Sequence, residues 1–383
     1  MTKTLLIFVC MTMLCDLFSQ DSLSILGNEA LVSQDYAKAF RYYNQSYQAD
    51  TNNVAAGFRT ANVSFILGNT QVSKELCLKL FSQSKDTSLF LPLLAKIYDS
   101  ENNASLSIKA YRKLCSLYPE NSTYFKKLAS IYSNNDLNND ALQMYKIAHN
   151  LNPNDITTII NLADAYLNAE MESLALATIL KGVKIDSTNN GVVKLSARIH
   201  YALKDYHAVV QELLALLEKA DLSSFYHNIL GISLMNIDSF DQAKFHLIKS
   251  FAHPEYKEYG YYYLATMEEK KDNYTQAMMY YDEAIRESIS PFLDSYLRRK
   301  GELFVQLEKY DESLVYFNKA YEYKDRPEYL YLIGQVYDLQ EQTAKAIDNY
   351  TKYIEITGGE GKYESLARVR IEYLRTRLGD GEK

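Results

Sequence analysis

Residues Ser122–Asp155 read STYFKKLASIYSNNDLNNDALQMYKIAHNLNPND. Apolar residues three or four positions apart lie on both sides of a polar run at 133–139, which is typical of two amphipathic helices joined by a turn. Large and small apolar residues alternate in the order Phe125, Leu128, Ala129, Tyr132, Ala141, Tyr145 and Ala148, and Pro153 follows them. Because small residues let two helices approach closely and large ones fill the gaps, the stretch predicts an antiparallel helix pair.

The same pattern returns every 34 residues along the chain. The first small residue of each unit is Gly27, Ala61, Ala95, Ala129, Ala163, Ala197, Gly231, Ala265, Gly301 or Gly334, with slight slippage at the last two. Twelve positions later stand Ala39, Ser73, Ser107, Ala141, Ala175, Val209, Ala243, Ala277, Ser313 and Ala346, and four positions after these stand Tyr43, Cys77, Tyr111, Tyr145, Ile179, Leu213, Leu247, Tyr281, Phe317 and Tyr350. A single helix pair cannot bury its apolar face alone, so we expect the pairs to stack.

This pattern resembles the tetratricopeptide repeat, a 34-residue unit of two antiparallel helices. Phe125 stands where that family usually has tryptophan. The resemblance implies an all-α, right-handed superhelical solenoid of about ten helix pairs over residues 20–360. Repeats one to ten are expected at about 20–53, 54–87, 88–121, 122–155, 156–189, 190–223, 224–257, 258–291, 294–327 and 327–360.

Residues 361–383 follow the last repeat and are expected to form a C-terminal capping helix and tail. Ala367, Ile371, Leu374 and Leu378 fall on one face of this helix, whereas four arginines lie elsewhere on it. Solenoids need such a terminal element because their last repeat has no neighbour to cover it.

Residues 1–20 contain one lysine, an apolar run from Leu5 to Leu14 and a polar exit. This order is typical of a secretory signal peptide, and the run is too short to span a bilayer. We therefore expect an exported protein, periplasmic or secreted, from a bacterial source. The alternatives are a buried first helix or an uncleaved N-terminus that tethers the protein to a membrane. No later segment is apolar enough to cross a membrane.

Composition and motifs argue against several classes of function. The formal net charge is −7, which argues against nucleic acid as a partner. No HExxH, CxxC, GxSxG or GxGxxG motif is present, and GGEGK at 358–362 lacks the other residues of a phosphate loop. We expect no catalysis, cofactor or metal. Cys77 and Cys115 are expected to be small buried residues, with one disulfide between them as the alternative.

The resemblance also implies a concave groove, lined by positions 2, 5, 9, 12 and 13 of each repeat's first helix. Lys126, Asn161, Lys194 and Arg198 lie at or beside such positions in repeats four to six. Their side chains could hold a carboxylate or an acidic peptide by charge-assisted hydrogen bonds, as in the carboxylate clamp of chaperone-binding repeats. The set departs from that clamp because Ser130 replaces its asparagine, so chance basic residues are the alternative.

The stretch YGYYYLATM at 259–267 carries four tyrosines. In the repeat register Tyr259 and Tyr262 fall at groove positions 2 and 5, whereas Tyr261 and Leu264 fall at core positions. Aromatic side chains are good contact anchors. We therefore expect a scaffold or adaptor that binds a protein or peptide in its groove. The alternative is an exported small-ligand protein, for example a glycan-binding protein that uses Tyr259 and Tyr262.

The export hypothesis predicts the mature N-terminus. Mass spectrometry of the protein from its native source is expected to find a chain that begins near Gln20 or Asp21. An intact Met1 on a cytoplasmic protein would show that the apolar run is not a signal peptide.

Overall fold

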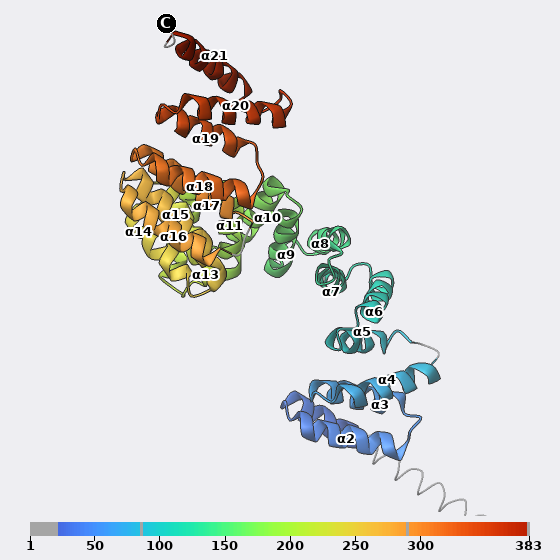
Figure 1. Cartoon of the computed structure of the whole chain (residues 1–383). Helices are drawn as coiled ribbons and strands as arrows, with labels where there is room; N and C mark the ends of the chain where they lie inside the picture. The colour runs from blue at the N-terminus through green and yellow to red at the C-terminus, as the bar shows by residue number, and fades with distance from the viewer. Residues whose placement is uncertain (1–21, 85–86, 289–290, 381–383) are drawn as a thin grey trace, which may run out of the picture. The chain divides into compact units, whose positions relative to one another are not determined.

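The computed structural model describes residues 22–84, 87–288 and 291–380, and these residues form helices joined by short turns, without a strand (Figure 1). The expected all-α fold of stacked helix pairs is confirmed. The predicted signal peptide lies outside the described residues. Over the described ranges, no helix has the length and apolar character that crossing a membrane requires.

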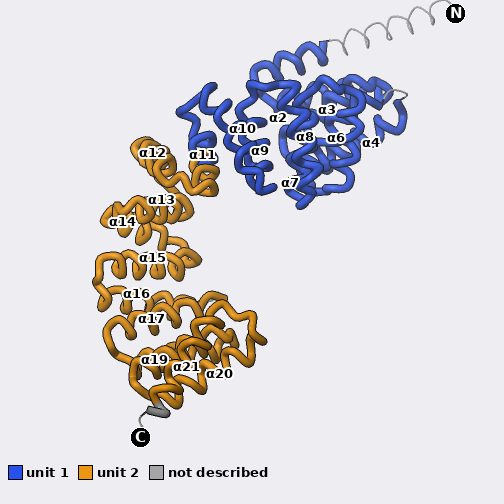
Figure 2. The backbone as a smooth tube through the Cα atoms, turned by 90° about the horizontal axis from the view of Figure 1, so that it is seen from above, with its two compact units in different colours: residues 1–195 blue, residues 196–383 orange. Residues whose placement is uncertain are grey.

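The chain divides into two compact units, residues 1–195 and 196–383 (Figure 2). In the first unit, residues 22–32 are helical and precede α2. The helices that follow are α2 (Tyr36–Ala49), α3 (Val54–Ile66), α4 (Thr70–Gln83), α5 (Leu91–Ser100), α6 (Ala104–Leu117), α7 (Ser122–Ser133), α8 (Asn138–Leu151), α9 (Ile156–Asn168) and α10 (Glu172–Ile185). Helix α11 (Asn190–Ala202) contains the boundary between the units.

The second unit continues the alternation of helices and ends on one unpaired helix. Its elements are α12 (Tyr206–Leu217), α13 (Ser224–Asn236), α14 (Phe240–Ser250), the short 3-10 helix η1 (Pro254–Tyr256), α15 (Lys257–Lys270), α16 (Tyr274–Glu287), α17 (Leu293–Gln306), α18 (Tyr310–Tyr323), α19 (Glu328–Leu339), α20 (Thr343–Thr357) and α21 (Glu364–Asp380). Helices α19, α20 and α21 therefore form repeat ten and the expected capping helix.

The repeated small and large residues form the contacts inside each helix pair. Ala129, Ala141 and Tyr145 are all buried in repeat four. Some of these contacts require glycine: a Cβ atom on Gly301 would lie 2.6 Å from a ring carbon of Phe317, sixteen positions later on the second helix. The alternation of sizes therefore sets how closely the two helices of a pair approach.

The turn inside each pair also repeats. One residue per turn adopts a left-handed backbone conformation, with φ between 53° and 82°: Gln34, Gly68, Asn102, Asp136, Glu170, Lys204, Asp238, Asp272, Glu308 and Glu341. This conformation ends the first helix and reverses the chain. Glycine occupies the position once in this set. In the other turns a non-glycine residue adopts this less favourable conformation, and the packing of the two helices compensates its cost in free energy.

Cys77 and Cys115 are both buried and free, so the alternative of a disulfide between them is wrong. Burial raises the pKa of the Cys77 thiol to about 12 and that of the Cys115 thiol to about 11. Because the thiolate is the reactive form, both thiols are expected to be inert at neutral pH.

The close contact at Gly301 predicts a specific energetic coupling. Gly301→Ala is expected to lower the free energy of unfolding by about 1–3 kcal/mol, the usual cost of overpacking a filled core. In a Phe317→Ala background the same change should cost much less, because the ring that the new Cβ would meet is then absent. Urea denaturation of the four proteins measures the coupling, and an equal cost in both backgrounds would contradict it.

Candidate functional site

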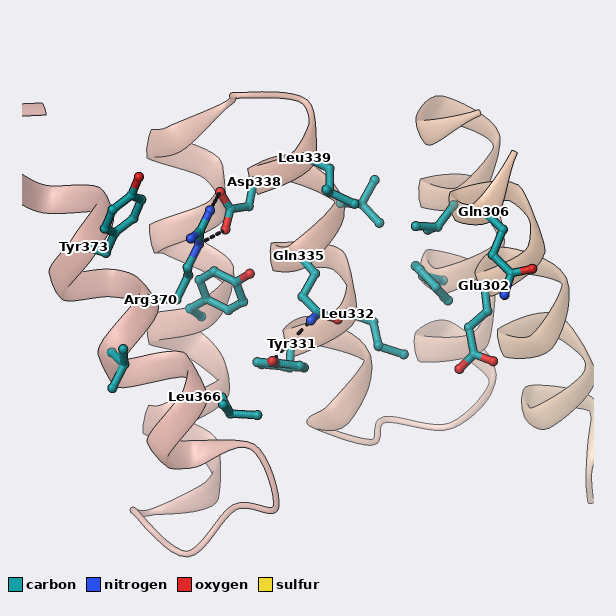
Figure 3. A pocket seen from close by; sticks show the side chains of 15 residues that line it. Glu302, Gln306, Tyr331, Leu332, Gln335, Asp338, Leu339, Leu366, Arg370 and Tyr373 are labelled. Carbon is teal, nitrogen blue, oxygen red and sulfur yellow. Dashed lines mark hydrogen bonds and ion pairs between the residues drawn. The ribbon is translucent and has the colours of Figure 1, made fainter. Parts of the chain in front are cut away.

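A pocket of about 810 Å³ lies at the C-terminal end of the second unit (Figure 3). We call it the terminal groove. Helices α17, α19 and α21 supply most of its lining, and Phe317 of α18 and Tyr350 of α20 complete it. The remaining lining residues are Glu302, Val305, Gln306, Tyr331, Leu332, Gln335, Val336, Asp338, Leu339, Leu366, Val369, Arg370 and Tyr373.

Helix α21 carries two apolar faces. Ala367, Ile371 and Leu374 are buried, as the sequence predicts for a capping helix, and Leu378 is not among the described side chains. Val369 and its neighbours Leu366 and Tyr373 lie on another face, line the terminal groove and are exposed, Val369 by 68%. Helix α21 thus covers the last repeat and also supplies an apolar wall of the groove.

Stacked tyrosines hold the start of α21 against repeat ten. The rings of Tyr363 and Tyr331 are nearly parallel, with centroids 4.5 Å apart and an interplanar angle of 12°. The backbone N–H of Tyr363 donates to the hydroxyl oxygen of Tyr353 at 2.7 Å. These contacts fix the position of the α21 wall relative to α19.

An ion pair joins α21 to α19 at the groove. The Arg370 guanidinium donates to both carboxylate oxygens of Asp338, with Nη2 2.9 Å from Oδ1 (Figure 3). Hydrogen bonding to Asp338 raises the pKa of Arg370 and outweighs the opposing effect of its burial. A bidentate pair of this kind fixes both distance and orientation.

The other polar groups of the groove also bond within the chain. Glu302 accepts from Arg298 and Arg299 of the same helix. The Gln335 amide donates to the Tyr331 hydroxyl at 3.2 Å. The groove therefore presents apolar side chains and amides, and its charged groups Glu302, Asp338 and Arg370 are paired within the chain.

The sequence-predicted donors of the first unit are partly engaged elsewhere. Lys126 forms an ion pair of 2.7 Å with Asp155, which caps α9 and also accepts from the hydroxyl of Thr158 at 2.6 Å. Burial tends to raise the pKa of Asp155, but the bonds from Lys126 and Thr158 outweigh it and lower the pKa overall. The Lys126 ammonium is therefore used to hold the start of the next repeat.

Asn161 lies in a small polar cavity of about 200 Å³ between α7, α8 and α9. Its neighbours there include Ser130, Asn134 and Asp164. Lys194 and Arg198 do not line this cavity. They are half-buried on α11, and each takes part in an interaction within the chain.

The tyrosines of α15 are less clearly divided between groove and core than the register suggests. Tyr259 is 37% exposed, and its ring meets Phe292 edge-on. The Tyr262 ring packs against Tyr281 and Tyr296 with centroids 6.1 and 5.3 Å apart, so it contributes to the core of repeats eight and nine. Tyr261 is also half-buried.

Leu264, the other residue assigned to the core in this stretch, is almost fully buried. The described residues contain no group of three or more acidic, histidine or cysteine side chains placed to hold a metal ion.

The sequence reasoning missed the terminal groove, although its signals were present. Applying the repeat register to repeats nine and ten places Glu302, Val305, Gln306, Tyr331, Gln335, Asp338 and Leu339 at groove positions. The spacing of Leu366, Val369 and Tyr373 marks a second apolar stripe on α21, at intervals of three and four residues. The arginines between them obscured this stripe.

Three segments of the chain, residues 93–121, 296–326 and 327–358, match the family model described as tetratricopeptide repeat. The last two contain much of the terminal groove. No curated protein matches the sequence.

Several solved structures are similar in fold. MamA from Desulfovibrio magneticus RS-1 is 12% identical over 45% of this chain and 97% of its own, with a TM-score of 0.42. YrrB, described as a TPR protein with an unusual peptide-binding site, is 18% identical over 49% of this chain and 96% of its own, with a TM-score of 0.44. A chain of the APC/C hetero-tetramer Cut9–Hcn1 is 12% identical over 93% of this chain and 96% of its own, with a TM-score of 0.43. Scores of this size carry no information on function.

The tyrosine stack predicts how α21 is held. Tyr363→Ala should weaken its docking by about 1.5 kcal/mol, since aromatic pairs contribute about 0.5–1.5 kcal/mol beyond their buried area. Hydrogen exchange of α21 amides should then rise roughly tenfold, with α13 unaffected. Tyr363→Phe keeps the ring and serves as the control. Unchanged exchange in Tyr363→Ala would show that the stack does not hold α21.

Proposed function

We propose that the chain, three segments of which match the tetratricopeptide repeat model, is a non-catalytic interaction scaffold that binds a protein or peptide segment in the terminal groove. The observation that carries the proposal is the exposed apolar wall of α21, which faces α19 across a pocket of about 810 Å³. That volume lies within the range of about 300–1,000 Å³ that is usual for ligand sites. Exposed apolar surface gathered in a concavity is typical of an interaction site.

The chemistry of the groove defines the segment that fits it. Val369, Leu339 and Tyr373 offer apolar and aromatic contacts from two helices. Gln306 and Gln335 offer side-chain amides, which can exchange hydrogen bonds with a peptide backbone. Since Asp338 and Arg370 neutralise each other, the groove favours a segment with apolar side chains over a charged one.

An acidic partner in the first unit, as expected from Lys126 and Asn161, has weaker support. Lys126 would have to exchange its ion pair with Asp155 for the ligand, and this exchange would remove the bond that holds the capping residue of α9 to α7. The Asp164 carboxylate lies in the same cavity as Asn161 and would repel a second carboxylate.

The small-ligand alternative depends on two tyrosines with accessible rings. Tyr259 meets this condition, but Tyr262 packs against the rings of Tyr281 and Tyr296. A stacking platform for a sugar needs an open aromatic face. Protein or peptide recognition at the terminal groove is therefore the better supported function.

The proposed site of action is outside the cytoplasm, in the periplasm or the medium. This part of the proposal depends on the sequence of residues 1–20 alone. The partner segment should be sought in the same compartment.

A matched pair of substitutions tests the groove. Val369→Glu places a carboxylate on the apolar wall, where binding would have to desolvate it. We expect at least a tenfold weaker dissociation constant for the partner segment captured from the native compartment, which corresponds to about 1.4 kcal/mol. Val315→Glu on α18 is the control, because Val315 is 50% exposed but does not line the groove.

The two variants separate binding from folding. Neither valine belongs to a buried stripe, so both proteins should unfold at urea concentrations close to that of the wild type. Equal affinity of Val369→Glu and wild-type protein for the segment would reject the terminal groove as the binding site.

A further inference from the structure

Two histidines face each other between the helices of repeat seven. The Nδ1 atom of His227 on α13 lies 3.0 Å from the Nδ1 atom of His246 on α14. Their rings are stacked, with centroids 5.1 Å apart and an interplanar angle of 22°. His246 is only 4% exposed. We call these residues the histidine pair.

The geometry of the histidine pair limits how many protons the two rings can carry. At 3.0 Å the two Nδ1 atoms share one hydrogen bond, so one ring donates its N–H and the other accepts through a lone pair. A proton on the accepting nitrogen would remove that lone pair and point two N–H groups at each other. It would also place a positive charge beside a ring that has almost no access to water. A proton on Nε2 of the donating ring would leave the bond in place, so the contact is lost when both rings are protonated and each Nδ1 carries a hydrogen.

Charges on the neighbouring elements do not compensate an imidazolium here. Lys249 of α14 and Asp221, which precedes α13, act on His227 with opposite signs, and the lysine has the larger effect. The charge that acts on His246 is that of His227 itself.

The carboxylates on the helices packed against the pair bond elsewhere. Glu212 of α12 holds His200 and Ser196. On α15, Glu268 accepts from Asn273, and Glu258 accepts from the Tyr296 hydroxyl at 2.9 Å. In η1, Glu255 lies 3.5 Å from His253. Protonation of the histidine pair in acid therefore creates positive charge that none of these carboxylates neutralises.

We propose that the histidine pair is an acid-sensitive joint: protonation of both rings leaves no lone pair for their hydrogen bond, places two positive charges between α13 and α14, and so separates these helices and opens repeat seven. In a repeat protein each unit contacts mainly its neighbours, so one pair of helices can open while the others stay folded. This proposal is independent of the terminal groove, which is lined by α17 to α21.

The direction of the pH dependence follows from burial. Burial, and secondarily the neighbouring His227, lowers the pKa of His246 from 6.5 to about 4, whereas the opened repeat has the ordinary value. The open form therefore binds protons more readily than the closed form. The contribution of the neutral His246 to the free energy of opening repeat seven is complete above about pH 6.5. It is lost as the pH falls towards about 4.

Nuclear magnetic resonance and hydrogen exchange on the full chain test the joint. The His246 ring signal should titrate well below the ordinary histidine range in the wild type. Between pH 6.5 and pH 5 the open population of repeat seven, measured from α13 and α14 amides after correction for intrinsic rates, should rise roughly tenfold per pH unit. His246→Leu should reduce this rise, because His227 is then the single histidine left between the two helices, and His207→Leu, which replaces an exposed histidine on α12, should leave the rise intact.

Two results would overturn the joint. One is titration of both rings at the ordinary histidine value in the wild type. The other is an acid-induced rise in exchange that is equal in all repeats, or that is undiminished in His246→Leu. If His246→Leu does not fold, the wild-type titration and the location of its acid-induced exchange decide the question.

Discussion

The close contact between a small residue on one helix and a large residue sixteen positions later sets the geometry of every repeat. Gly301 beneath Phe317 and Gly334 beneath Tyr350 show how close the contact is, since a Cβ on either glycine would lie less than 3 Å from the ring. Within each pair this contact fixes how closely two helices approach, and stacking of pairs buries the faces that remain. The first helices then line up side by side, and a groove follows from their order.

The second unit uses its last helix in two ways. A terminal helix must cover the apolar face of the repeat before it, and α21 does so with Ala367, Ile371 and Leu374. The same helix turns Val369 and Tyr373 towards α19, where the tyrosine stack and the Arg370–Asp338 pair hold it in place. A helix needed only for solubility would be polar on that side. The apolar side is therefore the feature that a function must explain.

The fold could be predicted from the sequence because its pattern of small and large residues is local and repeats every 34 residues. The left-handed turns could not: Glu170 and Lys204 have no special preference for that conformation, and the packing of the helices imposes it. The contacts of the candidate site residues could not be predicted from the repeat register either. The repeat register places Lys126 near the groove, but its ammonium forms an ion pair with Asp155, the capping residue of α9, which lies 29 residues later in the chain. The Tyr262 ring likewise packs on Tyr296 of the next repeat, a contact that the period alone does not specify.

The central claim is that the protein binds a partner segment in the terminal groove, between α17, α19 and α21. Site-specific photocrosslinking tests this claim most directly. A photoreactive side chain would be placed at Leu339 in the terminal groove and, separately, at Met279 on α16, which is 57% exposed. Crosslinked peptides from the native compartment are then identified by mass spectrometry. We expect one recurrent, predominantly apolar segment to be crosslinked to the side chain at Leu339 and not to the one at Met279. Equal crosslinking of that segment from both positions, or its crosslinking from Met279 alone, would contradict it.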